Sequence, residues 1–110
     1  MSAPRVELLW WEGCPSHPQA LADLRAAMSE MGLDPAAVDV REVTTDEQAG
    51  AEGFPGSPTI RVEGRDVQPP GEHDPVALTC RVYRLRDGRV SPTPDPEDVR
   101  AALRRGMGDD

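Results

Sequence analysis

The stretch V-E-L-L-W-W-E-G-C-P-S-H, from Val6 to His17, decides how the rest of the sequence is interpreted. Its first half, Val6–Trp11, is almost continuously apolar, which predicts a central strand covered on both faces. Gly13 ends this strand, and we expect Pro15 at the first position of a helix. Cys14 then lies at a helix N-terminus, where unpaired N–H groups and the helix dipole favour the thiolate form.

The following segments predict a helix, a strand and a second helix. Apolar residues recur at helical spacing over 15–31, and valines predict a strand over 38–44. Thr45, with Gln48 three residues later, fits a capping box that begins a short helix, and Gly53 ends it. A strand, a helix and a strand in this order predict a parallel pair with a right-handed crossover.

The second half of the sequence predicts a hairpin and a final helix. Thr59–Val62 alternates as a strand does, and after a turn at Glu63–Gly64 we expect residues 65–68 to return antiparallel. Residues 76–86 fit either a helix or a strand, because a short apolar run does not distinguish the two. The last helix begins after Asp95, with a proline at its first position.

Composition predicts one soluble domain spanning residues 1–110, with a frayed tail at 106–110. The net charge of −8 argues against nucleic acid or an anionic membrane as partner. No leader pattern and no long apolar run is present, so we expect a cytoplasmic protein with reduced cysteines. All 12 basic residues are arginine, which we attribute to GC-rich codon usage. One arginine cluster is expected to form a solvated face: Arg81, Arg84, Arg86 and Arg89.

Two motifs in this order resemble those of the thioredoxin-like family. Trp11–His17 resembles the family's W-x-x-C-P-x-C entry to its first helix, and Gly56–Ile60 resembles its x-Pro-Thr motif before the third strand. Residues 63–65 are similar to its hairpin turn. The resemblance covers most of residues 5–70 and implies an α/β fold: a thioredoxin-like three-layer sandwich with a mixed four-stranded sheet, flanked by helices, in the order βαβαββα.

The resemblance also implies a substrate groove beside the cysteine. Pro58 would be cis and would lie next to Cys14, leaving the backbone of Ser57 open to a bound thiol or peptide. Trp11 and Pro15 would complete the groove. An ordinary trans proline is the alternative interpretation of Pro58, since cis bonds are uncommon even before proline.

The second cysteine of the family motif is replaced by His17, so an internal dithiol mechanism cannot be carried over. Cys14 remains the candidate nucleophile, and His17 could tune its thiolate as a nearby cation. Cys80 is the candidate resolving thiol if residues 69–80 cross the sheet end that carries Cys14. It is out of reach if residues 79–85 pair with the third strand instead, and either cysteine could be a buried structural residue.

We therefore expect thiol–disulfide exchange with a protein or a low-molecular-weight thiol or disulfide, without a cofactor. The alternative is a non-catalytic module that binds a small molecule, a soft metal or a partner protein, with Trp10 or Trp11 near its pocket. Cys14, His17 and Cys80, joined by His73, are ligands that soft metals accept. A structural zinc site needs four ligands, however, and the C-x-x-H spacing alone supplies two, so no metal is expected.

Overall fold

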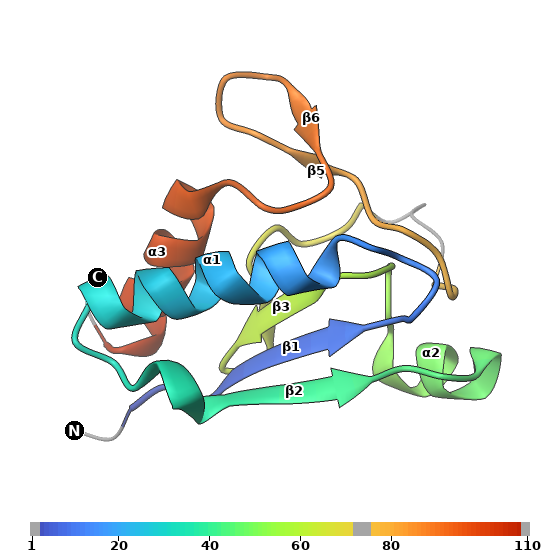
Figure 1. The fold of residues 1–110 in the computed structure, drawn as a ribbon, viewed down its shortest axis with the longest axis horizontal. Coiled ribbons are helices and arrows are strands. Elements are labelled where there is room, and N and C mark those ends of the chain that lie inside the picture. The colour runs from blue at the N-terminus through green and yellow to red at the C-terminus, as the bar shows by residue number, and fades with distance from the viewer. Residues whose placement is uncertain (1–2, 72–75, 109–110) are drawn as a thin grey trace.

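A mixed sheet of four strands forms the centre of the fold (Figure 1). The computed structural model describes residues 3–71 and 76–108. Its elements are β1 (Val6–Trp10), α1 (His17–Glu30), the 3₁₀ turn η1 (Pro35–Ala37), β2 (Val38–Glu42), α2 (Asp46–Glu52), β3 (Thr59–Val62), β4 (Arg65–Asp66), β5 (Tyr83–Arg84), β6 (Val90–Ser91) and α3 (Pro96–Gly106).

The strand order in the sheet is β2-β1-β3-β4. β1 runs parallel to β2, with Val6 opposite Val38, and antiparallel to β3, with Leu8 opposite Ile60. β3 and β4 form an antiparallel hairpin. The predicted α/β class and the mixed four-stranded sheet are therefore confirmed, and β1 occupies the central position that its apolar sequence indicated.

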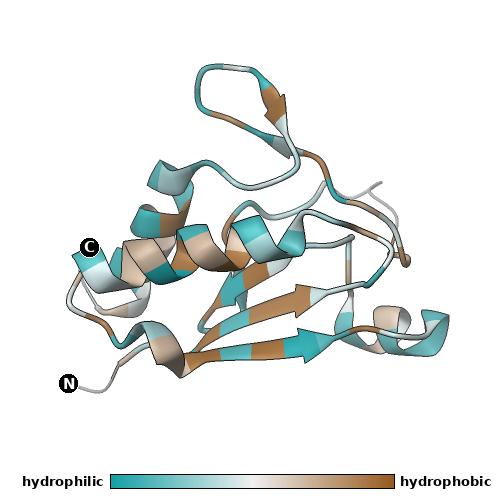
Figure 2. Cartoon of the chain, in the orientation of Figure 1, coloured by the Kyte–Doolittle hydropathy of each residue, from teal (hydrophilic) through white to brown (hydrophobic). Residues whose placement is uncertain are grey.

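The two faces of β1 contribute to two separate hydrophobic clusters, because successive strand residues point to opposite sides. Leu8 packs with buried residues of α1 and α3, including Leu24 and Leu103. Leu9 packs with Ala49 of α2 and with its neighbours in a smaller cluster. Figure 2 shows the hydrophobic bands of β1, β2 and β3 beneath the inner side of α1.

The first helix begins later than the sequence suggested. The Cys14 N–H donates to the Trp11 carbonyl at 3.1 Å, which makes a turn before the helix. α1 therefore starts at His17, and Pro18 rather than Pro15 occupies its first turn, where a missing N–H costs nothing. Cys14 precedes the helix by a short loop instead of standing at its first residue.

The capping of the second helix agrees with the predicted capping box. Thr45 Oγ1 accepts the Gln48 N–H at 3.1 Å, and Gly53 ends the helix in the left-handed region. The Gln48 side-chain oxygen in turn accepts the Thr44 N–H at 2.8 Å, rather than the Thr45 N–H of a standard capping box. β4 is shorter than expected, since the Asp66 carboxylate accepts the Gln68 N–H at 2.9 Å and turns the chain away.

Residues 76–86 form neither a helix nor a full strand. Cys80 makes an isolated parallel bridge to Ser57, and the chain continues into β5, which pairs with β6 in a two-stranded hairpin. This hairpin extends away from the main sheet (Figure 1). β5 does not pair with β3, so the arrangement that would have put Cys80 out of reach is not observed.

The C-terminal helix follows the prediction, since Asp95 accepts the Glu97 N–H at 2.9 Å and caps α3. α3 extends to Gly106, and the last two residues of the expected tail, like His73, lie outside the described part of the chain. Within residues 3–71 and 76–108, no helix combines the length and the apolar character needed to cross a membrane.

Candidate functional site

Ser57 joins the two loops that the sequence motifs identified. Its hydroxyl accepts the Trp11 N–H at 3.0 Å, and its carbonyl accepts the Cys14 thiol at 3.2 Å. The peptide bond between Ser57 and Pro58 is cis, and both residues are buried. The Cys14 loop and the loop before β3 therefore meet at this residue, as the resemblance implied.

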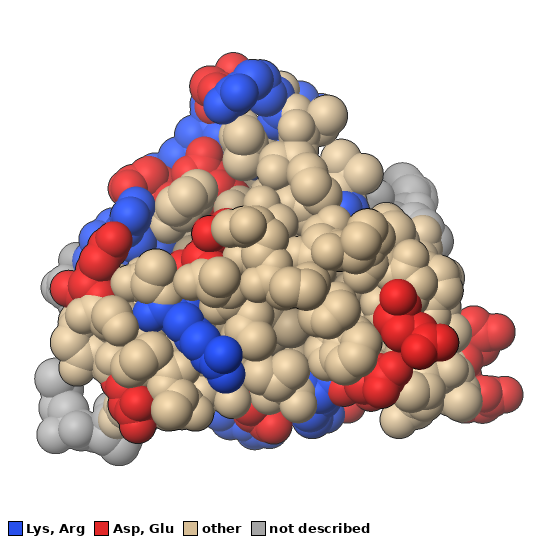
Figure 3. All heavy atoms as spheres, viewed as in Figure 1, with Lys and Arg blue, Asp and Glu red and all other residues tan. Residues whose placement is uncertain are grey.

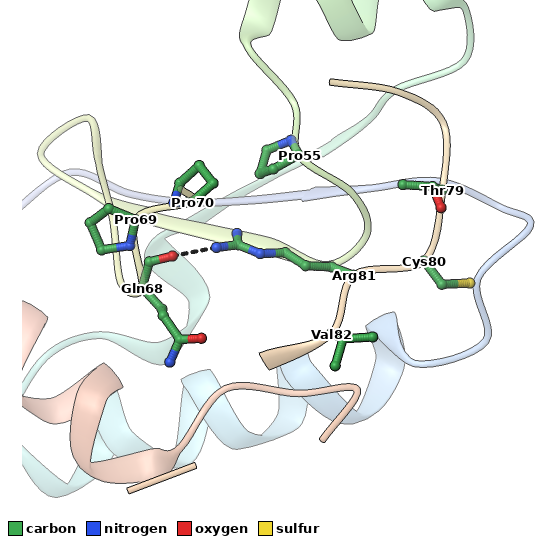
Figure 4. Close-up of a pocket in the computed structure, with 8 residues that line it drawn as sticks. All are labelled: Pro55, Gln68, Pro69, Pro70, Thr79, Cys80, Arg81 and Val82. Atoms are coloured by element: carbon green, nitrogen blue, oxygen red, sulfur yellow. Dashed lines mark hydrogen bonds between the residues drawn. The ribbon is translucent and has the colours of Figure 1, made fainter. Parts of the chain in front are cut away.

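A third segment completes the site. The Ser57 N–H donates to the Thr79 carbonyl at 2.8 Å, and the Arg81 N–H donates to the Ser57 carbonyl at 2.8 Å. Cys80 lies between these two bonds, opposite Ser57. Its side chain points toward the loop that joins β1 to α1 and carries Cys14 (Figure 4).

The sequence resemblance implied that the Ser57 backbone is free to bind a thiol or peptide. In the structure its N–H and its carbonyl are hydrogen-bonded to the chain's own residues. The groove expected at this point is occupied by residues 79–81.

The two thiols shift each other's pKa in opposite directions. Burial raises the pKa of Cys14, but the Ser16 backbone N–H, the Cys80 thiol and the hydroxyls of Ser16 and Ser57 lower it by more, so it lies below its ordinary value. The hydrogen bond to Cys14, with burial and the charge of the Cys14 thiolate, raises the pKa of Cys80. These opposite shifts make Cys14 the thiol that loses its proton first, whereas in its protonated form it donates to the Ser57 carbonyl.

The two cysteines also differ in their exposure to solvent. Both are free thiols, but Cys14 is only 1% exposed, whereas Cys80 is exposed to solvent. A hollow of about 260 Å³ is lined by Cys80 together with Pro55, Gln68, Pro69, Pro70, Thr79, Arg81 and Val82 (Figure 4). The cysteine with the lowered pKa and the cysteine exposed to solvent are thus different residues.

Arg81 anchors the segment that carries Cys80, and the sequence interpretation of this arginine was wrong. It was grouped with a solvated cluster, yet it is only 8% exposed. Its guanidinium contacts the two Asp66 carboxylate oxygens at 2.6 and 3.1 Å and donates to the Gln68 carbonyl. The signal that could have identified it is the alternation around Tyr83, which places positions 81 and 83 on one buried side.

Tyr83 and Gly56 also help to position the segment that carries Cys80 and Arg81. The Arg81 guanidinium lies 4.3 Å from the centre of the Tyr83 ring, and the Tyr83 hydroxyl donates to the Pro58 carbonyl at 2.5 Å. Burial raises the pKa of Tyr83, so its hydroxyl remains a donor. Gly56 has a φ of +134°, and a Cβ there would lie 3.1 to 3.2 Å from backbone and side-chain atoms of Arg81.

The remaining predicted site residues, His17, Trp11 and Pro15, lie around the loop between β1 and α1. Among the described residues, none of the three has an interaction with the Cys14 sulfur. The His17 ring stacks on Trp10, with ring centres 4.1 Å apart, and its Nδ1 lies 3.2 Å from the Cys14 carbonyl. Trp11 is half-buried, with its indole against Gly13, and Pro15 is exposed. His17 is therefore positioned by an aromatic contact, and the groups that lower the Cys14 pKa are those of Ser16, Ser57 and Cys80.

Metal ligation finds no support in this geometry. Across the described ranges, no group of three or more histidine, cysteine, aspartate or glutamate side chains is arranged to hold a metal ion. Cys14 and Cys80 are brought together, but the His17 ring is stacked elsewhere.

Comparisons with known proteins add no further information about this site. No protein-family model matches the chain, and no match was found among the curated proteins or the solved structures. The chemistry of the site is therefore inferred from its own residues: a buried cysteine with a lowered pKa, an exposed cysteine with a raised pKa, and a cis-proline loop that contacts both.

Proposed function

We propose that this protein is a thioredoxin-like thiol–disulfide exchange protein whose redox pair is Cys14 and Cys80. The observation that carries the proposal is the bridge between Cys80 and Ser57, the residue whose carbonyl contacts the Cys14 sulfur. Opposite pKa shifts of the two thiols support it, because a thiolate beside a protonated thiol is poised for exchange.

The thioredoxin-like assignment is supported by three features that occur together. Cys14 follows the central strand β1 and precedes α1. A cis proline precedes β3, and β3 is joined by a tight turn to the antiparallel strand β4. The cysteine that the family motif has at position 17 is absent, and Cys80 supplies the second sulfur from another part of the chain. Fold alone does not establish activity, so the assignment depends on these thiols.

The overall reaction is a two-electron exchange. The dithiol protein reduces an external disulfide, R–S–S–R, to two R–SH molecules, and a bond forms between the Cys14 and Cys80 sulfurs as the R–S–S–R bond breaks. The two protons come from the cysteine thiols. An external thiol reverses the reaction and restores the dithiol form.

The experiment is a count of free thiols and a measurement of intact mass after treatment with diamide and then with a reductant. The wild type is expected to lose both thiols together with two hydrogens and to regain them on reduction. Cys14→Ser and Cys80→Ser serve as controls, each retaining one thiol that forms no internal bond. Two free thiols in the oxidant-treated wild type would refute the redox pair and favour a binding module.

A further inference from the structure

Neither the backbone N–H nor the carbonyl of Ser57 is free to bind a substrate. Its N–H and its carbonyl are used by Thr79 and Arg81, each at 2.8 Å, and the carbonyl also accepts the Cys14 thiol. An extended peptide could pair with Ser57 only by displacing residues 79–81. The chain thus presents its own cysteine, Cys80, where a substrate would otherwise approach Cys14.

The segment that covers the site is firmly held. Arg81 is paired with Asp66 in a buried ion pair, and Ala77 donates its N–H to the Phe54 carbonyl at 3.1 Å. Gly56 allows the segment to approach the loop before β3 closely. Displacement would leave the Asp66 carboxylate buried without its partner, which is strongly unfavourable. The arrangement in which residues 79–81 are bonded to Ser57 is therefore the one that reacts.

In this arrangement the two cysteine residues differ in their exposure to a partner in solvent. Cys14 is 1% exposed and Cys80 is exposed. The Cys80 N–H and carbonyl also have no hydrogen bond to any described residue, since its bridge to Ser57 uses the groups of Thr79 and Arg81. Thr79 and Arg81, rather than Cys80 itself, therefore hold this stretch of backbone against Ser57.

The surroundings of the site favour an uncharged reactant. The segments 13–22, 54–60 and 76–80 contain no aspartate, glutamate, lysine or arginine, although charged residues make up 29% of the sequence. Arg81, which lines the hollow beside Cys80, is paired with Asp66. Figure 3 shows a broad uncharged area across the middle of the face seen in Figure 1, with charged side chains mostly around its edges. With a net charge of −8, the protein as a whole repels anionic thiols.

We propose that small thiols with no charged group besides the reacting sulfur exchange at Cys80, and that Cys14 leaves and returns as the buried thiolate; this inference rests on the proposed redox pair. A thiolate R–S⁻ attacks the Cys80 sulfur of the Cys14–Cys80 disulfide, forming Cys80–S–S–R, and the electron pair of the broken bond leaves with Cys14. A second R–S⁻ attacks the R sulfur, releasing R–S–S–R, and Cys80 takes a proton from water. Two external thiols are oxidised and the protein disulfide is reduced.

This order reverses the roles expected from the sequence, in which Cys14 receives the adduct and Cys80 resolves it. Exchange is faster when the leaving thiol has the lower pKa, and Cys14 is that thiol. The Ser16 N–H and the hydroxyls around Cys14 are already in place to receive the negative charge as it departs.

The test traps the first intermediate. Oxidised wild-type protein is mixed with 2-mercaptoethanol and quenched after short times with N-ethylmaleimide, which labels whichever cysteine has been released. Trypsin cuts after arginine and separates Cys14, in residues 6–25, from Cys80, in residues 66–81. The expected trapped intermediate carries mercaptoethanol on Cys80 and maleimide on Cys14.

The outcomes separate this inference from the proposed function. If mercaptoethanol is found on Cys14 in half or more of the trapped species, the inference is wrong while the redox pair stands. If diamide never produces the Cys14–Cys80 bond, the proposed function itself fails. Cys14→Ser and Cys80→Ser, treated with the disulfide of mercaptoethanol, give a second measurement: adduct formation must be faster on Cys80 alone than on Cys14 alone, and the opposite order overturns the inference.

Discussion

Ser57 and Arg81 are joined by a backbone hydrogen bond of 2.8 Å, and the Ser57 carbonyl that accepts it also accepts the Cys14 thiol. The position of the segment that carries Cys80 is therefore linked to the environment of Cys14. Arg81 is not part of the sulfur chemistry, but its buried side chain fixes the distance over which that chemistry occurs. It is a positioning residue for the proposed redox pair.

Arg81→Ala should destabilise the fold strongly. It leaves the buried Asp66 carboxylate without its partner, a change that typically costs about 3–5 kcal/mol. Urea unfolding with reductant present measures the effect. Arg84→Ala is the matched control, since Arg84 is exposed and should change stability by less than about 0.5 kcal/mol. Equal losses in the two variants would show that Arg81 contributes no more than a surface arginine.

Gly56→Ala should slow formation of the Cys14–Cys80 disulfide. The new Cβ would lie 3.1 to 3.2 Å from Arg81 atoms, including its backbone, and the φ of +134° disfavours any side chain. The segment must then shift away from Ser57, and oxidation by diamide should be slower than in the wild type. Gly64→Ala separates strain from displacement, because Gly64 also has a positive φ but has open space around it. An unchanged oxidation rate in Gly56→Ala would mean that the close contact is unimportant.

Elements determined by local signals were predicted well. The Thr45 cap, the Gly53 helix end and the Thr59–Val62 strand all depend on neighbouring residues, and the structure contains them. The first helix was misplaced because Pro15 and Pro18 are equally suited to a first turn. The bond from the Cys14 N–H to the Trp11 carbonyl, which no propensity encodes, selects the later start.

The site was only partly predictable, for reasons of sequence separation. The spacing of Cys14 and the Gly56–Ile60 motif indicated the loops that meet at Ser57. The position of Cys80 depends on contacts between Arg81 and Asp66, and between Tyr83 and Pro58, that join distant parts of the chain. Periodicity reports the faces of one segment and carries no information about such partners.

The reduced protein should gain stability as the pH rises toward about 8.5, the ordinary pKa of a thiol. The pKa of Cys14 is lower in the folded state, so between the two values the unfolded chain binds more protons and stability rises with pH. This contribution is lost as the pH falls through the folded pKa. Cys80 acts in the opposite sense, because its raised pKa makes stability fall above about 8.5.

Urea unfolding of reduced wild type and of Cys14→Ser across this pH range tests the expectation. The stability difference between them should increase from neutral pH, reach a maximum near 8.5 and then decrease, since the Cys14 shift disappears with its sulfur and the Cys80 shift loses its main cause, the hydrogen bond to Cys14. A difference that is constant with pH would contradict the assigned charge on Cys14.

Ser16 and His17 are adjacent, yet their removal should have different effects on the thiolate. The Ser16 hydroxyl, 3.6 Å from the Cys14 sulfur, lowers the Cys14 pKa, and it makes no cap bond to α1. In a Cys80→Ser background, where Cys14 is the remaining thiol, Ser16→Ala should raise the pKa measured from thiolate absorbance. His17→Ala should leave that pKa nearly unchanged and should instead alter tryptophan fluorescence, because the His17 ring stacks on Trp10. If His17→Ala raises the Cys14 pKa more than Ser16→Ala does, then His17 is the residue that tunes the thiolate, as the sequence suggested.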